Sequence, residues 1–276
     1  MANQSEQCAR LAAARDQYRR CLLCEHRCGV NRLAGEVGRC GAGATARVHR
    51  YRVEYGEELE LVPSCLFYLS GCDLRCVFCV GEQDAIDPSR GQALTVDLFQ
   101  SGLQAGLAQG ARTIQWVGGE PTIHLPAVFQ AMSQCSQLPT VVWKSNFHAT
   151  PEAMALLAGV VDVYVADFKF GNDRCAKQLA GIDDYFRIVT RNLMLAAQAG
   201  RLIVRHLLLP EHLDCCYRPI LQWLKTSLPG VALSLRDSYL PSWHAAEYGA
   251  LGQTIGRRAA RHARAMAEEM GLQVIQ

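Results

Sequence analysis

Three cysteines stand close together in the chain, at Cys72, Cys76 and Cys79. Their Cys-x3-Cys-x2-Cys spacing allows a single loop to bring three thiolates to one soft metal centre. A structural zinc site usually has four protein ligands, whereas a cubane iron–sulfur cluster held by three cysteines keeps one iron open for an outside ligand. The spacing therefore favours a cubane cluster with an open iron. The alternative is a structural zinc site that a distant residue completes.

A second group of cysteines lies nearer the N-terminus. Its members are Cys21, Cys24, Cys28 and Cys40. Four thiolates are a complete tetrahedral set, and zinc or a second iron–sulfur cluster would satisfy it. Nearby glycines allow the backbone to fold tightly round a centre. We expect a second metal site here; the alternative is that these thiols are reduced and bind nothing.

The remaining cysteines show no ligand spacing. They are Cys8, Cys65, Cys135, Cys175, Cys215 and Cys216. Free cysteines often behave as small buried hydrophobic residues, so we assign these six no role. The adjacent thiols of Cys215 and Cys216 follow a predicted strand, where they are able to face a cavity.

Composition narrows the class of protein. The chain has 276 residues, half of them hydrophobic, and 28 Lys+Arg against 26 Asp+Glu give a net charge of +2, which excludes a disordered chain. No apolar run approaches the roughly 18 residues of a membrane span, and the first residues lack the order of a signal peptide. Thirteen cysteines, an odd total, favour metal chemistry in a reducing compartment. We expect a cytoplasmic protein with neither nucleic acid nor membrane as its partner.

Short apolar runs alternate with helical patterns after residue 62. The predicted strands are Cys65–Leu69, Thr113–Val117, Thr140–Trp143, Val161–Ala166, Leu202–Leu209 and Val231–Leu235. The predicted helices are Val96–Gln109, Leu125–Cys135, Pro151–Ala158, Asp183–Gln198, Pro219–Ser227 and Ala245–Met270. Six βα units predict an α/β fold with a parallel sheet, either doubly wound or an incomplete barrel. Both arrangements place the chemistry at the C-terminal ends of the strands.

Residues 1–62 are predicted to form a Cys-rich extension, and residues 63–276 the barrel. Within the extension we expect a helix over Ser5–Arg20 and then a β-ribbon over Arg47–Val62 that turns near Gly56.

Five motifs at successive strand ends carry a resemblance to a known family. The motif of Cys72, Cys76, Phe78 and Cys79 resembles the Cys-x3-Cys-x-aromatic-Cys signature of radical S-adenosylmethionine (SAM) enzymes. Further motifs follow the next strands: Gly118-Gly119-Glu120-Pro121, Ser145-Asn146, Asp167-Phe168-Lys169, and Arg205 to Pro210. The resemblance covers about residues 65–245. It is nearest to the pyruvate formate-lyase activating enzyme family, in its PflX-like branch, where a Cys-rich segment also precedes the barrel.

The resemblance implies an incomplete (β/α)6 barrel, a [4Fe-4S] cluster, SAM and a low-potential electron donor of the flavodoxin or ferredoxin type. Cys72, Cys76 and Cys79 would be the catalytic cluster ligands. The implied cofactor-binding residues are Phe78, Gly118, Gly119, Glu120, Pro121, Ser145, Asn146, Asp167, Lys169 and His206. Phe78 would lie near the adenine and Glu120 would bind the ammonium group. One departure follows Cys79, where the Gln-Asn usual in the branch is replaced by Val80 and Gly81. Either Glu82 or Gln83 substitutes for the Asn, or its contact with the cofactor is lost.

The residues after the sixth strand are candidates for the substrate site. Tyr239, Trp243 and His244 stand where an incomplete barrel is open. We consider three functions: a radical enzyme acting on a protein or peptide, a radical enzyme acting on a small molecule, and a non-catalytic iron–sulfur electron carrier or zinc module. The first is favoured by the Asp-x-Lys resemblance and the open side of the barrel.

Overall fold

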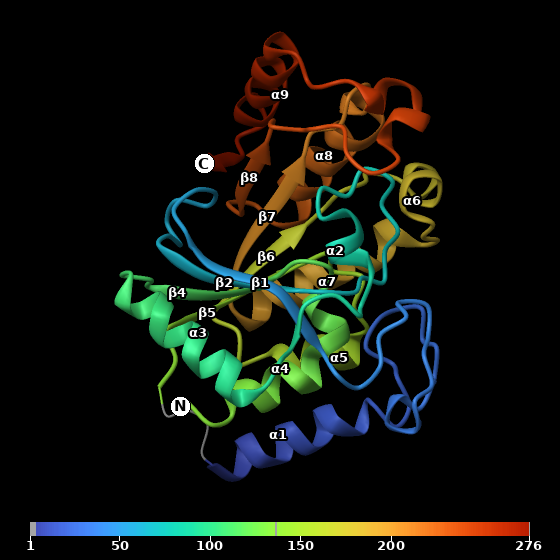
Figure 1. Ribbon diagram of the computed structural model, residues 1–276. Coiled ribbons are helices and arrows are strands. Elements are labelled where there is room, and N and C mark those ends of the chain that lie inside the picture. The colour runs from blue at the N-terminus through green and yellow to red at the C-terminus, as the bar shows by residue number, and fades with distance from the viewer. Residues whose placement is uncertain (1–3, 136, 276) are drawn as a thin grey trace.

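The computed structural model describes residues 4–135 and 137–275, and these residues build one nine-stranded sheet (Figure 1). Its spatial order is β3-β1-β2-β4-β5-β6-β7-β8-β9. The strands are β1 (Arg47–Glu54), β2 (Ser64–Leu69), β3 (Gln92–Ala93), β4 (Thr113–Val117), β5 (Thr140–Ser145), β6 (Val163–Asp167), β7 (Arg201–Leu207), β8 (Ala232–Arg236) and β9 (Gln273–Ile275). From β2 to β9 every neighbouring pair is parallel, whereas β1 is antiparallel to β2 and β3.

The strand order decides between the two predicted architectures. A doubly wound sheet reverses its strand order at a switch point, but β2 to β8 follow one another in chain order without reversal. Right-handed crossovers then place all the connecting helices on one face and curl the sheet toward a barrel. Among the described residues, no pairing joins β8 or β9 to β1 or β3, so the barrel is open on one side. The predicted incomplete α/β barrel is confirmed, with β9 as an additional short strand.

Most of the helices lie on the outer face of this sheet (Figure 1). The helices are α1 (Gln4–Asp16), α2 (Glu82–Ile86), α3 (Val96–Ala108), α4 (Leu125–Met132), α5 (Pro151–Leu157), α6 (Asp173–Ala180), α7 (Tyr185–Ala199), α8 (Arg218–Ser227) and α9 (Arg257–Glu269). Helix α1 instead packs on α4 and α5, and α2 lies at the ends of the strands. Helix α6 is absent from the sequence prediction. Its signals are local: the Asn172 side chain accepts a hydrogen bond from the Cys175 amide, and Gly181 ends the helix in a left-handed conformation.

Two other predicted elements are wrong in extent. The predicted β-ribbon over Arg47–Val62 stops at Glu54, because β1 already has strand partners on both sides, and Glu57 and Glu58 have positive φ angles. The predicted last helix, Ala245–Met270, is formed only as α9. Short 3₁₀ turns at Ala245–Glu247 and Gly249–Gly252 precede it, in a stretch where glycine disfavours a continuous helix.

The N-terminal segment packs against the barrel. Helix α1 runs beneath α4 (Figure 1), and Ala14, Tyr18 and Leu23 belong to the same apolar core as the strands. Backbone pairing between Cys24 and Ala149 fastens the Cys-rich loop to the segment that follows β5. The division of the chain at residue 62 stays a prediction.

The interior of the barrel contains a layer of apolar side chains and, next to it, a layer of charged side chains. Leu61, from the loop between β1 and β2, packs on Val142, Val163, Val165 and Ile203 and fills the interior. The same loop supplies two carboxylates to one lysine, because the Lys144 Nζ lies 2.7 Å from a Glu57 oxygen and 3.0 Å from a Glu58 oxygen. Ser234 also donates a hydrogen bond to Glu58. The loop therefore closes the interior through both apolar packing and buried ion pairs.

No helix in residues 4–135 and 137–275 combines the length and apolar character needed to cross a membrane.

The buried ion pairs make Lys144 a stability determinant. The side chain of Lys144 is 8% exposed and that of Glu58 is 1% exposed, so Lys144→Met leaves a buried carboxylate without its nearest cation. We expect the free energy of unfolding to fall by about 3 kcal/mol in urea titrations. The matched control is Lys177→Met, which breaks an exposed pair with Asp183 and should cost less than ~1 kcal/mol. Equal losses in the two variants would contradict this account of the loop.

Candidate functional site

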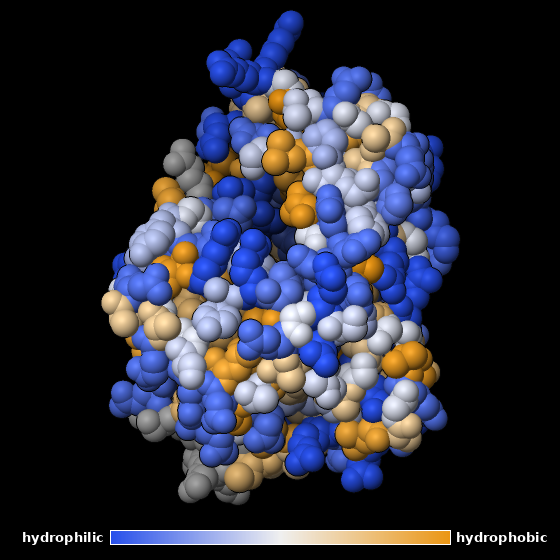
Figure 2. All heavy atoms as spheres, viewed as in Figure 1, coloured by the Kyte–Doolittle hydropathy of each residue, from blue (hydrophilic) through white to orange (hydrophobic). Residues whose placement is uncertain are grey.

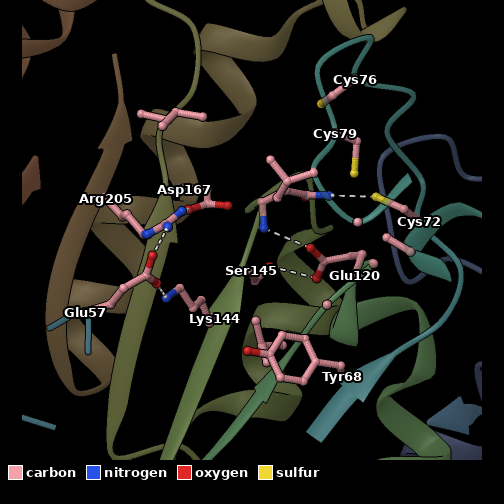
Figure 3. Close-up of a pocket in the computed structure, with 18 of the residues that line it drawn as sticks. Glu57, Tyr68, Cys72, Cys76, Cys79, Glu120, Lys144, Ser145, Asp167 and Arg205 are labelled. Carbon is pink, nitrogen blue, oxygen red and sulfur yellow. Dashed lines mark hydrogen bonds and ion pairs between the residues drawn. The ribbon is translucent and has the colours of Figure 1, made fainter. Parts of the chain in front are cut away.

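A cavity of about 440 Å³ opens at the C-terminal ends of the parallel strands. Figure 2 shows a hollow on this face, with hydrophilic side chains along its walls and hydrophobic ones at its rim. In Figure 3 the three cysteines of the first motif lie on one side, and Asp167, Arg205, Glu57 and Lys144 lie on the other. The predicted residues that line it are Cys72, Phe78, Cys76, Cys79, Gly118, Gly119, Glu120, Ser145, Asn146, Asp167, Lys169 and Tyr239.

The three cysteines occupy the loop that follows β2. Backbone hydrogen bonds from Arg75 and Val77 to the end of α6 hold this loop in place. Burial raises the pKa of the Cys72 thiol well above its ordinary value, and the charge of Asp73 adds to the effect; burial also raises the pKa of Cys76 to about 12. Thiols of this kind ionise only when a bound cation compensates the charge. Their shared cavity and their chemistry fit an iron–sulfur cluster.

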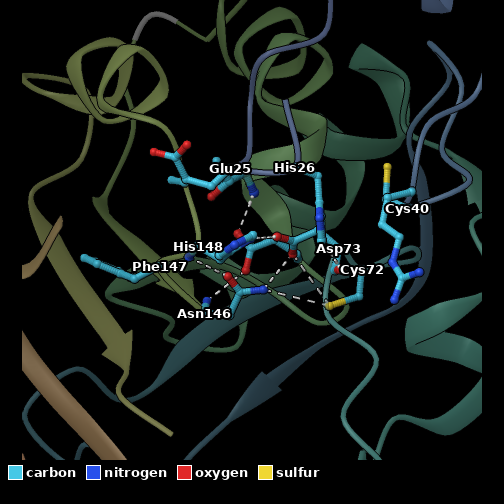
Figure 4. A network of polar contacts seen from close by, with 12 residues as sticks. Glu25, His26, Cys40, Cys72, Asp73, Asn146, Phe147 and His148 are labelled. Atoms are coloured by element: carbon cyan, nitrogen blue, oxygen red, sulfur yellow. Dashed lines mark hydrogen bonds and ion pairs between the residues drawn. The ribbon is translucent and has the colours of Figure 1, made fainter. Parts of the chain in front are cut away.

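Asp73 ties the cysteine loop to the loop after β5 (Figure 4). Its carboxylate accepts hydrogen bonds from Asn146 Nδ2 at 2.7 Å and from His148 Nδ1 at 2.8 Å, and the Asn146 amide also lies 3.9 Å from the Cys72 sulfur. Burial acts to raise the pKa of Asp73, but the hydrogen bond and charge of His148 hold it below its usual range. The Asn146 side chain is thus committed to positioning Cys72.

Glu120 organises the ends of β4 and β5. One of its carboxylate oxygens accepts hydrogen bonds from the Thr122 backbone N–H and the Ser145 hydroxyl, both at 2.8 Å. The other accepts a hydrogen bond from the Asn146 backbone N–H at 2.8 Å. Burial raises the pKa of Glu120 to about 7. A carboxylate offers about four acceptor sites, so one remains for a ligand in the cavity.

The two glycines before Glu120 have backbone conformations that other residues rarely adopt. Gly118 and Gly119 have φ angles of +74° and +44°, and a Cβ on Gly119 would overlap the Gly71 carbonyl oxygen. Pro121 begins the 3₁₀ turn Pro121–His124 and is buried, but it does not line the cavity. The motif therefore places Glu120 beside the cysteine loop.

Asp167 and Lys169 form the opposite wall together with Arg205. The Lys169 Nζ lies 2.6 Å from Asp167 Oδ2, and Arg205 Nη1 lies 3.2 Å from Asp167 Oδ1. Burial acts against both charges, yet Lys169 and Arg205 hold the pKa of Asp167 well below its usual range, and Asp167 raises the pKa of Lys169. Both Asp167 and Lys169 are therefore charged at neutral pH.

The sequence prediction did not include Glu57 and Glu58, and it gave Arg205 no role beyond its place at the start of a motif. Glu57, Glu58 and Arg205 line the cavity, with Arg205 Nη2 lying 2.9 Å from Glu57. The alternation of side chains along β7 could have identified Arg205 from the sequence. Arg205 and Leu207 face the cavity, and their neighbour His206 must therefore face the other way. No local pattern marks Glu57 and Glu58, which reach the cavity only through tertiary packing.

His206 and two substrate candidates lie away from the cavity. The buried His206 ring lies against Tyr217 on the outer face, and its Nδ1 donates to the Phe168 carbonyl. His244 is exposed beside Glu247, and Trp243 packs on His244. Neither side chain lines the cavity, unlike Tyr239. Of the residues after Cys79, Val80 and Gly81 line it, whereas Glu82 and Gln83 do not.

The N-terminal cysteines are close in the chain but not compact in space. Cys21, Cys24 and Cys40 are buried and Cys28 is exposed. Arg32 lies 3.4 Å from the Cys40 sulfur. Among the described residues, no three of these four sulfurs lie within 4.8 Å of one another, whereas sulfurs on one tetrahedral zinc are about 3.8 Å apart. The arrangement is wider than a single zinc ion requires.

Comparisons with known proteins agree with this geometry. Residues 66–224 match the model of the radical SAM superfamily. A Methanocaldococcus jannaschii protein described as uncharacterized is 34% identical over 272 residues, which span 95% of this chain and 78% of that protein.

Solved structures with low sequence identity share the fold. Streptococcus suis SuiB, in crystal structures with the precursor peptide SuiA and with SAM, aligns with a TM-score of 0.52 at 14% and 13% identity, over 74% of this chain. The aligned part is 46% and 47% of the SuiB chain, so this chain spans about half of its length. The match to the superfamily model, which covers more than half of the chain, shows that this chain belongs to the radical SAM superfamily.

Proposed function

We propose that this protein binds a [4Fe-4S] cluster through Cys72, Cys76 and Cys79 and uses SAM to abstract hydrogen from a protein or peptide. The observation that carries the proposal is the shared cavity, where the three thiols face a wall of fixed charges. When bound and reduced, the cluster supplies the electron that cleaves the SAM sulfonium, which yields methionine and a 5′-deoxyadenosyl radical able to take a hydrogen atom.

Different residues of the cavity would bind different parts of the ligands. Glu120 offers its remaining acceptor site to the ammonium group of SAM, and the Asp167–Lys169 pair presents one charge of each sign to the polar parts of the ligands. Phe78 supplies an aromatic face on the same wall as the cysteines. Because these groups are already held by protein hydrogen bonds, little reorganisation is needed when the ligands bind.

The open side of the barrel favours a large substrate. The cavity reaches from Arg50 and Arg52 on β1 to Arg236 on β8, and these two strands lie next to the short edge strands β3 and β9. Val80 and Leu240 line it and are 70% and 61% exposed, so apolar side chains are available for contact at its edge. SuiB, which shares the fold, binds a precursor peptide. An extended segment could enter by this route, as the resemblance to activating enzymes implies.

Two further requirements belong to this proposal. The cluster needs a low-potential electron donor of the flavodoxin or ferredoxin type. All thirteen cysteines are free thiols, which fits a cytoplasmic, reducing setting. The N-terminal cysteines are proposed as a second metal centre, which either zinc or an iron–sulfur cluster would satisfy.

Removal of one cluster ligand tests the proposed chemistry. In protein reconstituted anaerobically with iron and sulfide, Cys76→Ala should abolish the release of 5′-deoxyadenosine from SAM, because two thiolates cannot hold the open cluster. Chromatographic assay of 5′-deoxyadenosine after dithionite reduction checks this. Cys135→Ala, a partly buried cysteine outside the cavity, is the control and should retain release. Full release by Cys76→Ala would overturn the ligand assignment.

Variants of Lys169 and His206 distinguish the effect of a side chain in the cavity from the effect of one on the outer face of the barrel. Lys169→Met removes a charge that lines the cavity while Arg205 still compensates Asp167, so we expect kcat/KM for SAM cleavage to fall at least about tenfold with little change in Tm. His206→Gln should lose about 1–3 kcal/mol of stability and keep most activity, because the ring packs and donates away from the cavity. The opposite division would contradict the proposed orientations.

The class of substrate can be tested by isotope transfer. An extract from cells of the source organism grown on deuterated medium is divided by ultrafiltration, and each fraction is incubated with reduced enzyme and unlabelled SAM. We expect deuterium to enter 5′-deoxyadenosine with the macromolecular fraction, and to be absent after protease treatment of that fraction. Transfer only from the filtrate that persists after protease treatment of the filtrate would replace the proposal with a small-molecule substrate.

A further inference from the structure

A second set of metal-ligating side chains lies outside the cavity. It joins Cys175 on α6 to His212 and Cys215, which belong to the segment after β7. A ring nitrogen of His212 and the two sulfurs all lie within 4.8 Å of one another, and the two sulfurs are 3.8 Å apart. None of these residues lines the cavity, so the set is separate from the proposed radical site.

The backbone brings these residues together through close contacts. The Asn172 amide donates to the Cys215 carbonyl oxygen at 2.6 Å, while its side-chain oxygen accepts from the Cys175 amide at 2.8 Å. Gly171 is required here, because a Cβ at that position would overlap the carbonyl group of Cys216. The segment Leu213–Tyr217 forms a π-helix, a rare geometry that is frequent at functional sites.

The distances match those of a thiolate-bound divalent ion. Two sulfurs held at about 2.3 Å by one tetrahedral zinc are about 3.8 Å apart, the separation found between Cys175 and Cys215. The His212 Nδ1 faces the Pro210 carbonyl oxygen at 2.7 Å and must donate to it, which leaves Nε2 unprotonated in the neutral ring. Such a carbonyl partner is the usual support of a metal-binding histidine.

A further thiol, that of Cys216, lies beside the set. The sulfur of Cys216 lies 3.9 Å from that of Cys215, and the residue is fully buried. The Asn172 amide nitrogen lies 3.3 Å from the Cys175 sulfur and 3.6 Å from that of Cys216. We propose that Cys175, His212 and Cys215 bind a zinc ion.

An ion at this site would fasten α6 to the segment after β7. The last residues of α6 accept hydrogen bonds from Arg75 and Val77, which lie between the cysteines of the first motif. Gly171 and Asn172 also follow Lys169 closely in the chain. The zinc site is therefore placed to stabilise both walls of the cavity, although its existence does not depend on SAM chemistry.

Zinc binding tests the site without an activity assay. Protein with its iron–sulfur sites reconstituted is equilibrated with zinc alone, and bound zinc is counted by mass spectrometry. Cys215→Ser should bind about one zinc fewer per chain than wild type, and His212→Gln should bind that zinc at least about tenfold more weakly. Cys135→Ser, another partly buried cysteine, is the matched control and should bind as wild type does.

A second measurement uses the wild-type protein, so its result does not depend on whether the variants fold. Zinc should slow alkylation of Cys175 and Cys215 by iodoacetamide, as read by peptide mass spectrometry, and leave alkylation of the exposed Cys8 unchanged. Equal alkylation with and without zinc, or equal zinc content in wild type and Cys215→Ser, would overturn the proposal. A disulfide between Cys175 and Cys215 in anaerobically prepared, zinc-free protein would overturn it in favour of a redox pair.

Discussion

The burial of one carboxylate, that of Asp73, holds the cysteine loop in its position. A buried charge is tolerated only when hydrogen bonds and opposite charge compensate it, and Asp73 finds both in Asn146 and His148 after β5. The His26 ring from the N-terminal segment completes the contact through the Asp73 carbonyl oxygen. Three segments far apart in the chain thereby meet beside Cys72, and none of them can shift without exposing or isolating this charge.

A second charged network shapes the opposite wall. Glu57, Glu58 and Asp167 alternate with Lys144 and Arg205, so the barrel interior carries paired charges rather than a purely apolar filling. The apolar layer below excludes water from one side of this network, which strengthens each pair. The open side of the sheet leaves the other side accessible. The result is a cavity that is rigid at its base and open to a substrate at its edge.

The N-terminal segment is better described as a partner of the barrel than as an independent unit. Its helix buries Ala14, and the turn after the helix buries Tyr18, in the common core; its cysteine loop pairs with the residues after β5. Cys24 is therefore close to Asp73, whose charge is one of the factors that raise the pKa of its thiol, after burial itself. Changes at the N-terminal cysteines should consequently be transmitted to the loop that carries Cys72.

The sequence by itself determined which segments form the parallel strands, the α/β class and the motifs at the strand ends, whereas the order of the strands within the sheet was decided by the tertiary structure. It could do so because hydrophobic period and cysteine spacing are local properties of the chain. Tertiary structure alone decided which charges meet inside the barrel: Glu57 and Glu58 sit in a loop with no strand or helix pattern, and Lys144 pairs with them across more than eighty residues. The same holds for Cys175 and Cys215, which have no ligand spacing in the sequence and approach only because α6 packs against the π-helix after β7. Strand β7 shows both contributions. The sequence motif correctly located the strand, but only the pleat of the folded sheet decided that Arg205 points into the cavity and His206 to the outer face.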